Sequence, residues 1–388
     1  MSEAEDRRIR RLVAVHALTG FTATLVARVP DPMVAEIGAD LARPATTVAL
    51  LASFYALPFA LVQPFLGPIG DALGKRRVIL VCQFLFGALV LASAFAPDFA
   101  TLAVLRGLSG AAGGGIFPLM LALFGDEVPL ARRQVAISRL LFFSILGQIA
   151  GGAVAAGLEP LLGWRGVIAA CGLLALAAAL ILLIGRGGPE PLRPFRPADA
   201  LARYRRLVRL PQARVLYAAV AINGGLALGL APYLAPLLMG RAAGGTAEAG
   251  LTLAAFGAGG LIYATLVGWM LPRLGQAGIL RLGGALGAAG MLTLIGAGQI
   301  WALLVAGLLL GTGYTMVHST IQVRASEIAP DARGAAMSLH AFSFFTGQFL
   351  GPIVYGAALG VVGVAATLGA AGCGLFALAV WLAGRRGP

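Results

Sequence analysis

Gly67-Pro-Ile-Gly-Asp-Ala-Leu-Gly-Lys-Arg-Arg77 is a glycine-rich turn with an embedded acid and a basic tail, and it lies between two long apolar runs. A less exact copy, Gly268-Trp-Met-Leu-Pro-Arg-Leu-Gly275, follows 201 positions later. The first and last glycines keep their spacing, and a proline replaces the acid. A short turn repeated between apolar runs predicts a membrane protein built from two related halves.

The composition supports membrane-spanning helices. Apolar residues make up 59% of the 388 positions and charged residues only 12%. A helix needs about 20 apolar residues to cross a hydrocarbon core of ~30 Å, and runs of that length recur along the chain. The twelve predicted spans are approximately 12–32, 46–69, 77–96, 99–124, 134–158, 165–185, 212–238, 248–271, 278–297, 299–324, 334–358 and 361–384.

The net charge of +13 is distributed unevenly over the loops. Basic residues cluster at 7–11, 75–77, 132–133, 186–214 and 385–386, on alternate sides of the predicted spans. This is the positive-inside pattern, and it predicts that both termini are cytoplasmic. A nucleic-acid partner is not needed to explain the charge, and we expect none.

The two predicted halves are residues 1–185 and 212–388, joined by a cytoplasmic basic linker at 186–211. The linker ends in Arg203-Tyr-Arg-Arg-Leu-Val-Arg209, which predicts a short amphipathic helix on the inner leaflet. Further matches between the halves are Gly110 with Gly311, Pro129 with Pro330, Arg132 with Arg333, and Gly147-Gln148 with Gly347-Gln348. Parallel repeats of this kind place a substrate site between the halves at mid-membrane.

The turn at 67–77 closely resembles the loop between spans 2 and 3 of the major facilitator superfamily. The resemblance covers essentially the whole chain. It implies an all-α membrane protein with twelve transmembrane helices in two six-helix pseudo-symmetric halves and both termini cytoplasmic. It also implies a multi-pass location in a bacterial-type inner membrane. Within the superfamily, the chain is most similar to the twelve-span drug and metabolite proton antiporter branch, although Gln148 replaces the proline of that branch's span 5 motif.

The resemblance also implies a conformational latch at the cytoplasmic side. In the superfamily, the acid of this loop faces the start of span 11 and nearby basic residues. For Asp71 the candidate partners are Arg132, Lys75 and the helix start near Gly334. The predicted latch residues are Gly67, Gly70, Asp71, Gly74, Lys75, Arg76 and Arg132.

Four titratable residues in the spans are candidates for proton coupling: Asp31, Arg106, His318 and His340. Asp31 resembles the span 1 acid of proton-coupled relatives, or it closes an outer gate with Arg28, three residues away. Arg106 resembles a buried arginine of span 4 that assists proton relay or binding; the alternative is a structural arginine that satisfies carbonyls of span 1. Histidine changes charge near physiological pH, but a lone membrane histidine is often only a hydrogen-bonded core residue.

A further set of polar residues is predicted to line the substrate cavity: Thr24, Arg28, Arg139, Gln148, Asn223, Tyr314 and Gln348. Tyr314, His318 and Gln322 are spaced by four and share one helix face. Arg139 faces the cavity or extends to the inner surface. Together these side chains make the pathway neutral to positive, which favours a neutral or anionic small solute.

The sequence predicts a monomeric secondary transporter that moves a small organic solute by alternating access, with protons and the lipid bilayer as its other partners. Proton-coupled efflux is the main prediction. The alternatives are a uniporter or importer of an organic anion or sugar, and a receptor that has kept the fold. The sequence shows no metal-binding cluster, catalytic triad or phosphate-binding loop. We therefore expect no enzyme activity, metal or cofactor.

Overall fold

The computed structural model describes residues 3–185, 197–329 and 332–385, and its regular structure is helical. The first half contains α1 (Glu3–Arg28), the 3₁₀ helix η1 (Asp31–Met33), α2 (Val34–Asp40), α3 (Ala45–Val48), α4 (Leu51–Leu73), α5 (Lys75–Ser93), α6 (Phe99–Gly114), α7 (Ile116–Glu127) and α8 (Leu130–Ile184). Helix α9 (Pro197–Arg209) follows. The second half contains α10 (Pro211–Leu228), the 3₁₀ helix η2 (Ala231–Tyr233), α11 (Leu234–Met239), α12 (Thr246–Gly296), α13 (Ile300–Glu327) and α14 (Arg333–Ala383).

The described residues contain nine helical segments long and apolar enough to cross a membrane. Three of them, within α8, α12 and α14, are 50 or 51 residues long, about twice the length that a bilayer requires. Each contains one glycine with positive φ, at Gly163 (64°), Gly275 (61°) and Gly363 (76°). The chain turns back at these glycines, so each long helix supplies two spans. The predicted twelve spans in two six-helix halves are confirmed.

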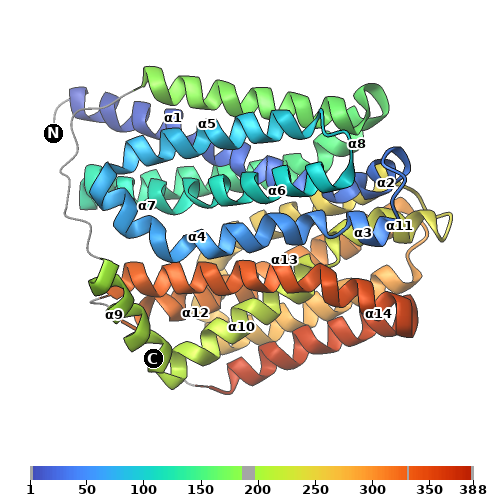
Figure 1. Ribbon diagram of the computed structural model, residues 1–388. Helices are drawn as coiled ribbons and strands as arrows, with labels where there is room; N and C mark the ends of the chain where they lie inside the picture. Colours follow the sequence, from blue (N-terminus) through green and yellow to red (C-terminus); the bar gives the residue numbers. More distant parts are fainter. Residues whose placement is uncertain (1–2, 186–196, 330–331, 386–388) are drawn as a thin grey trace.

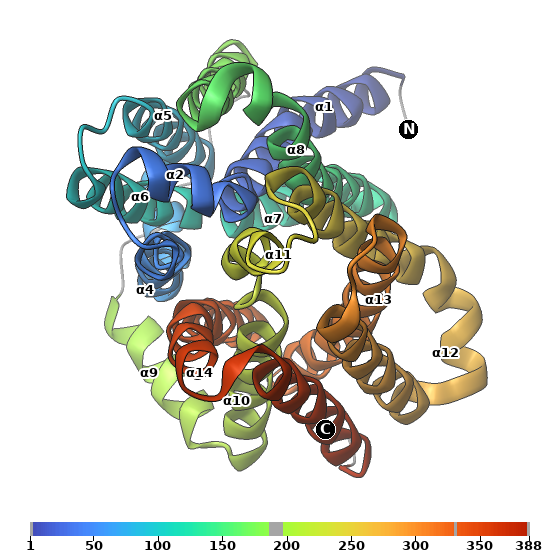
Figure 2. The same ribbon diagram turned by 90° about the vertical axis from the view of Figure 1, so that its right-hand side faces the viewer.

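Helix α1 begins and α14 ends at the same end of the bundle as α9, and α2, α3 and α11 lie at the opposite end (Figure 1). The basic residues at 7–11, 75–77 and 132–133 lie at the end that contains α9, which we call the basic end. By the positive-inside rule the basic end is the cytoplasmic end, and we call the opposite one the outer end. Seen end-on, the blue-to-green helices of the first half lie beside the yellow-to-red helices of the second (Figure 2). The predicted linker helix falls within α9, while residues 186–196 lie outside the described part of the chain.

The repeat is visible in how the helices pack. Gly110 of α6 lies against the backbone of Tyr55, and Gly311 of α13 lies against the backbone of Phe256 in the same way. Both members of the second pair are 201 positions after those of the first. In lipid, small residues let helix backbones approach closely, which provides van der Waals contact without a hydrophobic driving force. The two halves therefore share a packing scheme as well as a sequence pattern.

The last glycine of the repeated turn is explained by its backbone conformation. Gly74 ends α4 with φ 90°, and Gly275 turns α12 with φ 61°. Side chains other than hydrogen are disfavoured at such angles. Both copies of the turn therefore need glycine at this last position. The acid is under no such backbone constraint, and Pro272 replaces it in the second copy.

We predict that Gly275→Ala destabilises the protein while Gly268→Ala does not. At either site an added Cβ meets no heavy atom of the described residues within 4 Å, so crowding by these residues does not distinguish the two. Gly275 has φ 61° and ψ 174°, where a non-glycine residue costs about 1–3 kcal/mol, whereas Gly268 is helical. The midpoint of thermal unfolding in detergent should fall for Gly275→Ala only. Equal midpoints would contradict this account of the turn.

Candidate functional site

A cavity of about 390 Å³ lies between the two halves. Residues of α1, η1, α4, α6, α7 and α8 line one side of it, and residues of α10, α12, α13 and α14 line the other. It extends from the level of Asp31 and Pro352 near the outer end toward Gln322 and Leu141 in the cytoplasmic halves of their helices. Its volume is within the usual range for small-molecule sites, about 300–1,000 Å³.

Arg28 occupies the outer end of the cavity and contacts both halves. Its Nη2 donates a hydrogen bond to Oε1 of Gln348 at 2.7 Å, and its Nη1 lies 3.6 Å from Oδ2 of Asp31. Asp31 is only 3% exposed. The Nε2 amide of Gln348 is buried and has no hydrogen-bond partner among the described residues. We call Arg28, Asp31 and Gln348 the outer polar cluster.

Aromatic rings form the walls of the cavity. The rings of Phe59 on α4 and Phe345 on α14 lie 3.7 Å apart between centroids and so join the two halves. Phe344 packs edge-on against Phe345, and Phe256 lies against Tyr314. Such faces suit a flat apolar or aromatic molecule, since offset and edge contacts between rings are favourable.

Two histidines face each other deeper in the cavity. The centroid of His318 on α13 lies 5.5 Å from that of His340 on α14, 5.3 Å from Tyr314 and 4.7 Å from Phe344. Nδ1 of His318 and both ring nitrogens of His340 are buried without a hydrogen-bond partner among the described residues. Four-residue spacing explains the arrangement, because Tyr314, His318 and Gln322 share one face of α13. We call His318 and His340 the histidine pair.

Direct contacts between the halves close the outer end. Ser53 Oγ donates to the carbonyl of Phe349 at 2.7 Å, and the hydroxyl of Thr246 bonds Glu36. At the cytoplasmic end, helix α9 connects the halves through Tyr204, whose hydroxyl donates to the carbonyl of Pro64 at 2.7 Å. None of these six residues was among the predicted site residues, and no sequence pattern distinguishes them.

Two predicted cavity residues, Thr24 and Gln148, line it together with the clusters above. The Thr24 hydroxyl donates to the carbonyl of Ser144 at 2.7 Å, which ties α1 to α8.

Two others lie elsewhere, and this corrects the sequence-based prediction. Arg139 is exposed and is not part of the lining, because it lies about 200° around α8 from Leu141, which does line it. Asn223 is fully buried within the second half, away from Leu228, the lining residue of its helix.

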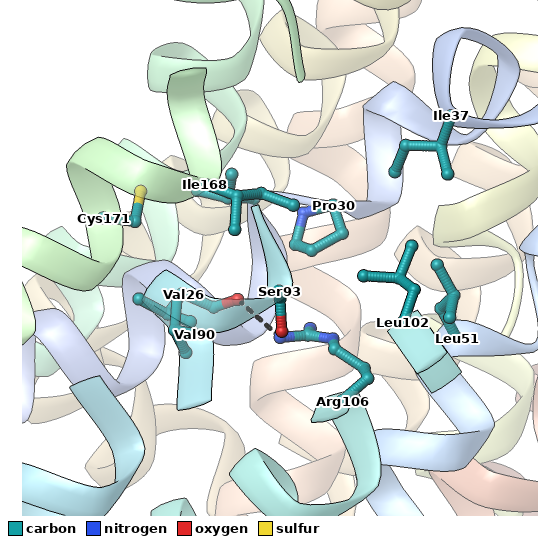
Figure 3. Close-up of a pocket in the computed structure, with 11 residues that line it drawn as sticks. Val26, Pro30, Ile37, Leu51, Val90, Ser93, Leu102, Arg106, Ile168 and Cys171 are labelled. Atoms are coloured by element: carbon teal, nitrogen blue, oxygen red, sulfur yellow. Dashed lines mark hydrogen bonds between the residues drawn. The ribbon is translucent and has the colours of Figure 1, made fainter. Parts of the chain in front are cut away.

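Arg106 makes the contacts expected of a structural arginine that satisfies carbonyls of span 1. Its Nη1 and Nη2 donate to the carbonyls of Val26 and Ala27 at 3.3 and 3.1 Å, and its guanidinium lies 4.4 Å from the centre of the Tyr55 ring. The carbonyl of Val26 is available because residue 30 is a proline, which has no N–H to bond it within the helix. Figure 3 shows Arg106 beside a small pocket of about 20 Å³, lined by the first half alone, with room for about one water molecule.

At the cytoplasmic end, the predicted latch residues take part in a network within the first half. Lys75 bonds Asp71 at 2.6 Å and Asp126 at 2.8 Å. Arg76 pairs with Glu127. Lys75 is thus the partner of Asp71 in this state, and the network ties the α4–α5 turn to α7. Gly70 packs closely on Leu119 of α7, Gly67 has open space around it, and Arg132 is half-buried in the first turn of α8.

We predict that Arg106→Leu lowers the thermal unfolding midpoint in detergent more than Arg139→Leu does. The change leaves two buried carbonyls without their charged donor, and hydrogen bonds to charged groups contribute about 1.5–3 kcal/mol each. Arg139 is exposed, so its replacement serves as the matched control. An unchanged midpoint combined with lost transport would instead give Arg106 a direct role in proton relay.

Comparisons with known proteins agree with this architecture. The solved structure of the nucleoside transporter NupG superposes with a TM-score of 0.81 at 12% identity, covering 96% of this chain and all of that one. A D-xylose–proton symporter superposes with a TM-score of 0.80 at 17% identity, covering 98% of both chains. At these identities the likeness shows the fold alone.

Sequence relatives are transporters of several solutes. The chain is 30% identical to the 4-hydroxybenzoate transporter PcaK of Pseudomonas aeruginosa over 53% of its length, and to a gallate transporter of Pseudomonas putida over 68%. These matches span 54% and 65% of the lengths of the two relatives. A probable sugar efflux transporter of Pasteurella multocida is 26% identical over 99% of this chain and 96% of that protein.

The family model described as Major Facilitator Superfamily matches residues 17–352 and 216–388. The matched relatives are transporters rather than enzymes. This chain is a multi-pass membrane protein that belongs to the Major Facilitator Superfamily.

Proposed function

We propose that this secondary transporter carries a small organic anion together with a proton. The observation that carries the proposal is the outer polar cluster, where a guanidinium and an unpartnered amide donor meet at the closed end of the cavity. A guanidinium has five N–H donors, and the contacts to Asp31 and Gln348 use only part of them. Arg28 and Gln348 can therefore bind a carboxylate, which accepts hydrogen bonds from both.

The walls of the cavity favour an anion that contains a ring. Phe59, Phe344 and Tyr314 provide flat apolar faces next to the polar cluster. Two of the relatives are named for 4-hydroxybenzoate and gallate. Both the aromatic walls and these names support an aromatic carboxylate as the substrate class.

The position of Asp31 suggests how a proton is coupled. While Asp31 is ionised, it neutralises part of the charge that Arg28 offers to an anion. Protonation of Asp31 leaves the guanidinium to the substrate, so the proton and the anion bind better together than separately. Such coupling is reciprocal, and typical coupling energies are about 1–3 kcal/mol. Joint binding corresponds to symport, which the proton gradient drives inward across a bacterial inner membrane.

Alternating access follows from rocking of residues 1–185 against residues 212–388, with 186–211 as the connection. The state described is closed at the outer end by Arg28–Gln348, Ser53–Phe349 and Thr246–Glu36 contacts. These contacts must separate for the cavity to open outward. In that state, we propose, Asp71 latches the cytoplasmic end. Because one chain completes the cavity, we propose a monomer as the working unit.

Proton-coupled export, the main prediction from the sequence, remains the second candidate. The match to a probable sugar efflux transporter over 99% of the chain favours it. The outer polar cluster favours an anion over a cationic substrate, because the acid there is paired with a cation.

We predict that Arg28→Met weakens binding of 4-hydroxybenzoate and lowers its uptake, whereas Arg139→Met does neither. Loss of a buried charge-assisted contact of about 1.5–3 kcal/mol corresponds to a roughly 10- to 100-fold weaker affinity. The measurement is uptake of the labelled acid into proteoliposomes, with protein-free liposomes giving the passive background. If the two variants transport equally, Arg28 is not the anion site.

We predict that Asp31→Asn keeps exchange of substrate across the membrane but loses accumulation driven by a pH gradient. The amide cannot release a proton, so coupling is lost while the guanidinium stays available. Asp98→Asn is the control, because Asp98 caps α6 through the N–H of Thr101 outside the spans and asparagine caps a helix equally well.

The sign of the gradient decides between the two candidate functions. Accumulation driven by an alkaline interior indicates symport. Accumulation driven by an acidic interior would indicate antiport, and with it the export candidate.

A further inference from the structure

Ring nitrogens of the histidine pair have no hydrogen-bond partner among the described residues. Nδ1 of His318 and both ring nitrogens of His340 are buried without partners among the described residues, and His340 is 3% exposed. Both side chains line the cavity. A buried polar atom left without a hydrogen bond costs about 1–3 kcal/mol. Three such atoms on two side chains that line one cavity point to a ligand.

The chemistry of the pair selects a particular ligand group. A neutral imidazole carries one donor and one acceptor nitrogen. Two imidazoles with centroids 5.5 Å apart can therefore give one hydrogen bond to a group and take another from it. A hydroxyl both donates and accepts. A hydroxyl can therefore pair with a donor nitrogen and an acceptor nitrogen at once, whereas a carboxylate pairs only with donors and an ammonium only with acceptors.

The distance between the two polar sites matches one ring. His340, Phe344 and Gln348 follow each other at four-residue intervals on α14, and all three line the cavity. Eight residues correspond to about 12 Å along a helix. Hydrogen bonds of about 3 Å at each end leave about 6 Å for the ligand, which is the span of a benzene ring with polar groups at opposite ends. Phe344 lies midway and faces such a ring.

We propose that the histidine pair binds a ring hydroxyl of the substrate, and that the carrier thereby selects hydroxylated aromatic acids over unsubstituted ones. This inference rests on the proposed anion site at Arg28, since the carboxylate must be held there for the hydroxyl to reach the pair. Arg28 lies on α1, whereas the histidine pair lies on α13 and α14 and makes separate contacts, so each can be removed alone.

The test is binding of benzoate and 4-hydroxybenzoate to the purified full-length protein in detergent, measured by isothermal titration calorimetry. The wild-type protein should bind 4-hydroxybenzoate at least tenfold more tightly than benzoate. His340→Leu and His318→Leu should each reduce that ratio toward one while benzoate affinity stays unchanged. Retained benzoate binding shows that a variant is folded. His340→Phe and His318→Phe, which keep a flat ring but have no ring nitrogens, serve where a leucine variant does not fold.

His16→Leu is the matched control, because His16 is buried outside the cavity with its Nδ1 hydrogen-bonded to the carbonyl of Leu12. It should leave the ratio intact. A wild-type ratio near one, or histidine variants that keep the wild-type ratio, would overturn the inference while leaving the anion site in place. Tighter binding of terephthalate, with a second carboxylate in place of the hydroxyl, would also overturn it. Failure of the wild-type protein to bind either acid would overturn both proposals.

Discussion

Everything in the cavity depends on the requirement that backbone groups within a bilayer find their hydrogen bonds inside the protein. A continuous helix meets this requirement alone, but α1 is interrupted at Pro30 and leaves carbonyls without their usual donors. Arg106 supplies donors for two of them. The guanidinium of Arg106 therefore bonds backbone carbonyls of the first half, whereas that of Arg28 bonds Gln348 in the other half. The break in α1 thus gives different contacts to two arginines, the buried Arg106 and the partly buried Arg28.

The two halves have the same helix packing and turns, but each contributes different polar side chains to the cavity. Their glycine contacts and their turns with positive φ correspond position by position. The charged side chains of the outer polar cluster, Arg28 and Asp31, belong to the first half, while the histidine pair belongs to the second. A substrate that touches both sites joins the halves. Its binding energy can then contribute to holding them in one arrangement, which is how a carrier links occupancy to conformation.

The sequence predicted the architecture well because its signals are local. Apolar runs, basic loops and a repeated turn reveal spans, orientation and the repeat without any tertiary information. The i, i+3 pair of Arg28 and Asp31 and the shared face of Tyr314 and His318 were also predictable, since they depend only on helical spacing.

Contacts between helices were not predictable. Arg28 and Gln348 are 320 positions apart, and the meeting of His318 with His340 depends on how α13 and α14 lie against each other. In lipid, both the buried and the lipid-facing sides of a helix are apolar, so periodicity reveals little about which way a polar residue turns. Arg139 and Asn223 were predicted to line the cavity from their polarity alone, and this is why the prediction was wrong for both.

The contact of α8 with α12 has a mechanical consequence. Gly152 lies directly against the backbone of Gly250, and Gly257 lies against Ile149, so these helices from opposite halves touch with little side-chain material between them. Interlocked side chains must disengage before two helices can rotate, and a smooth backbone surface removes most of that barrier. At this glycine contact, one half can therefore rotate against the other while α8 and α12 stay in contact.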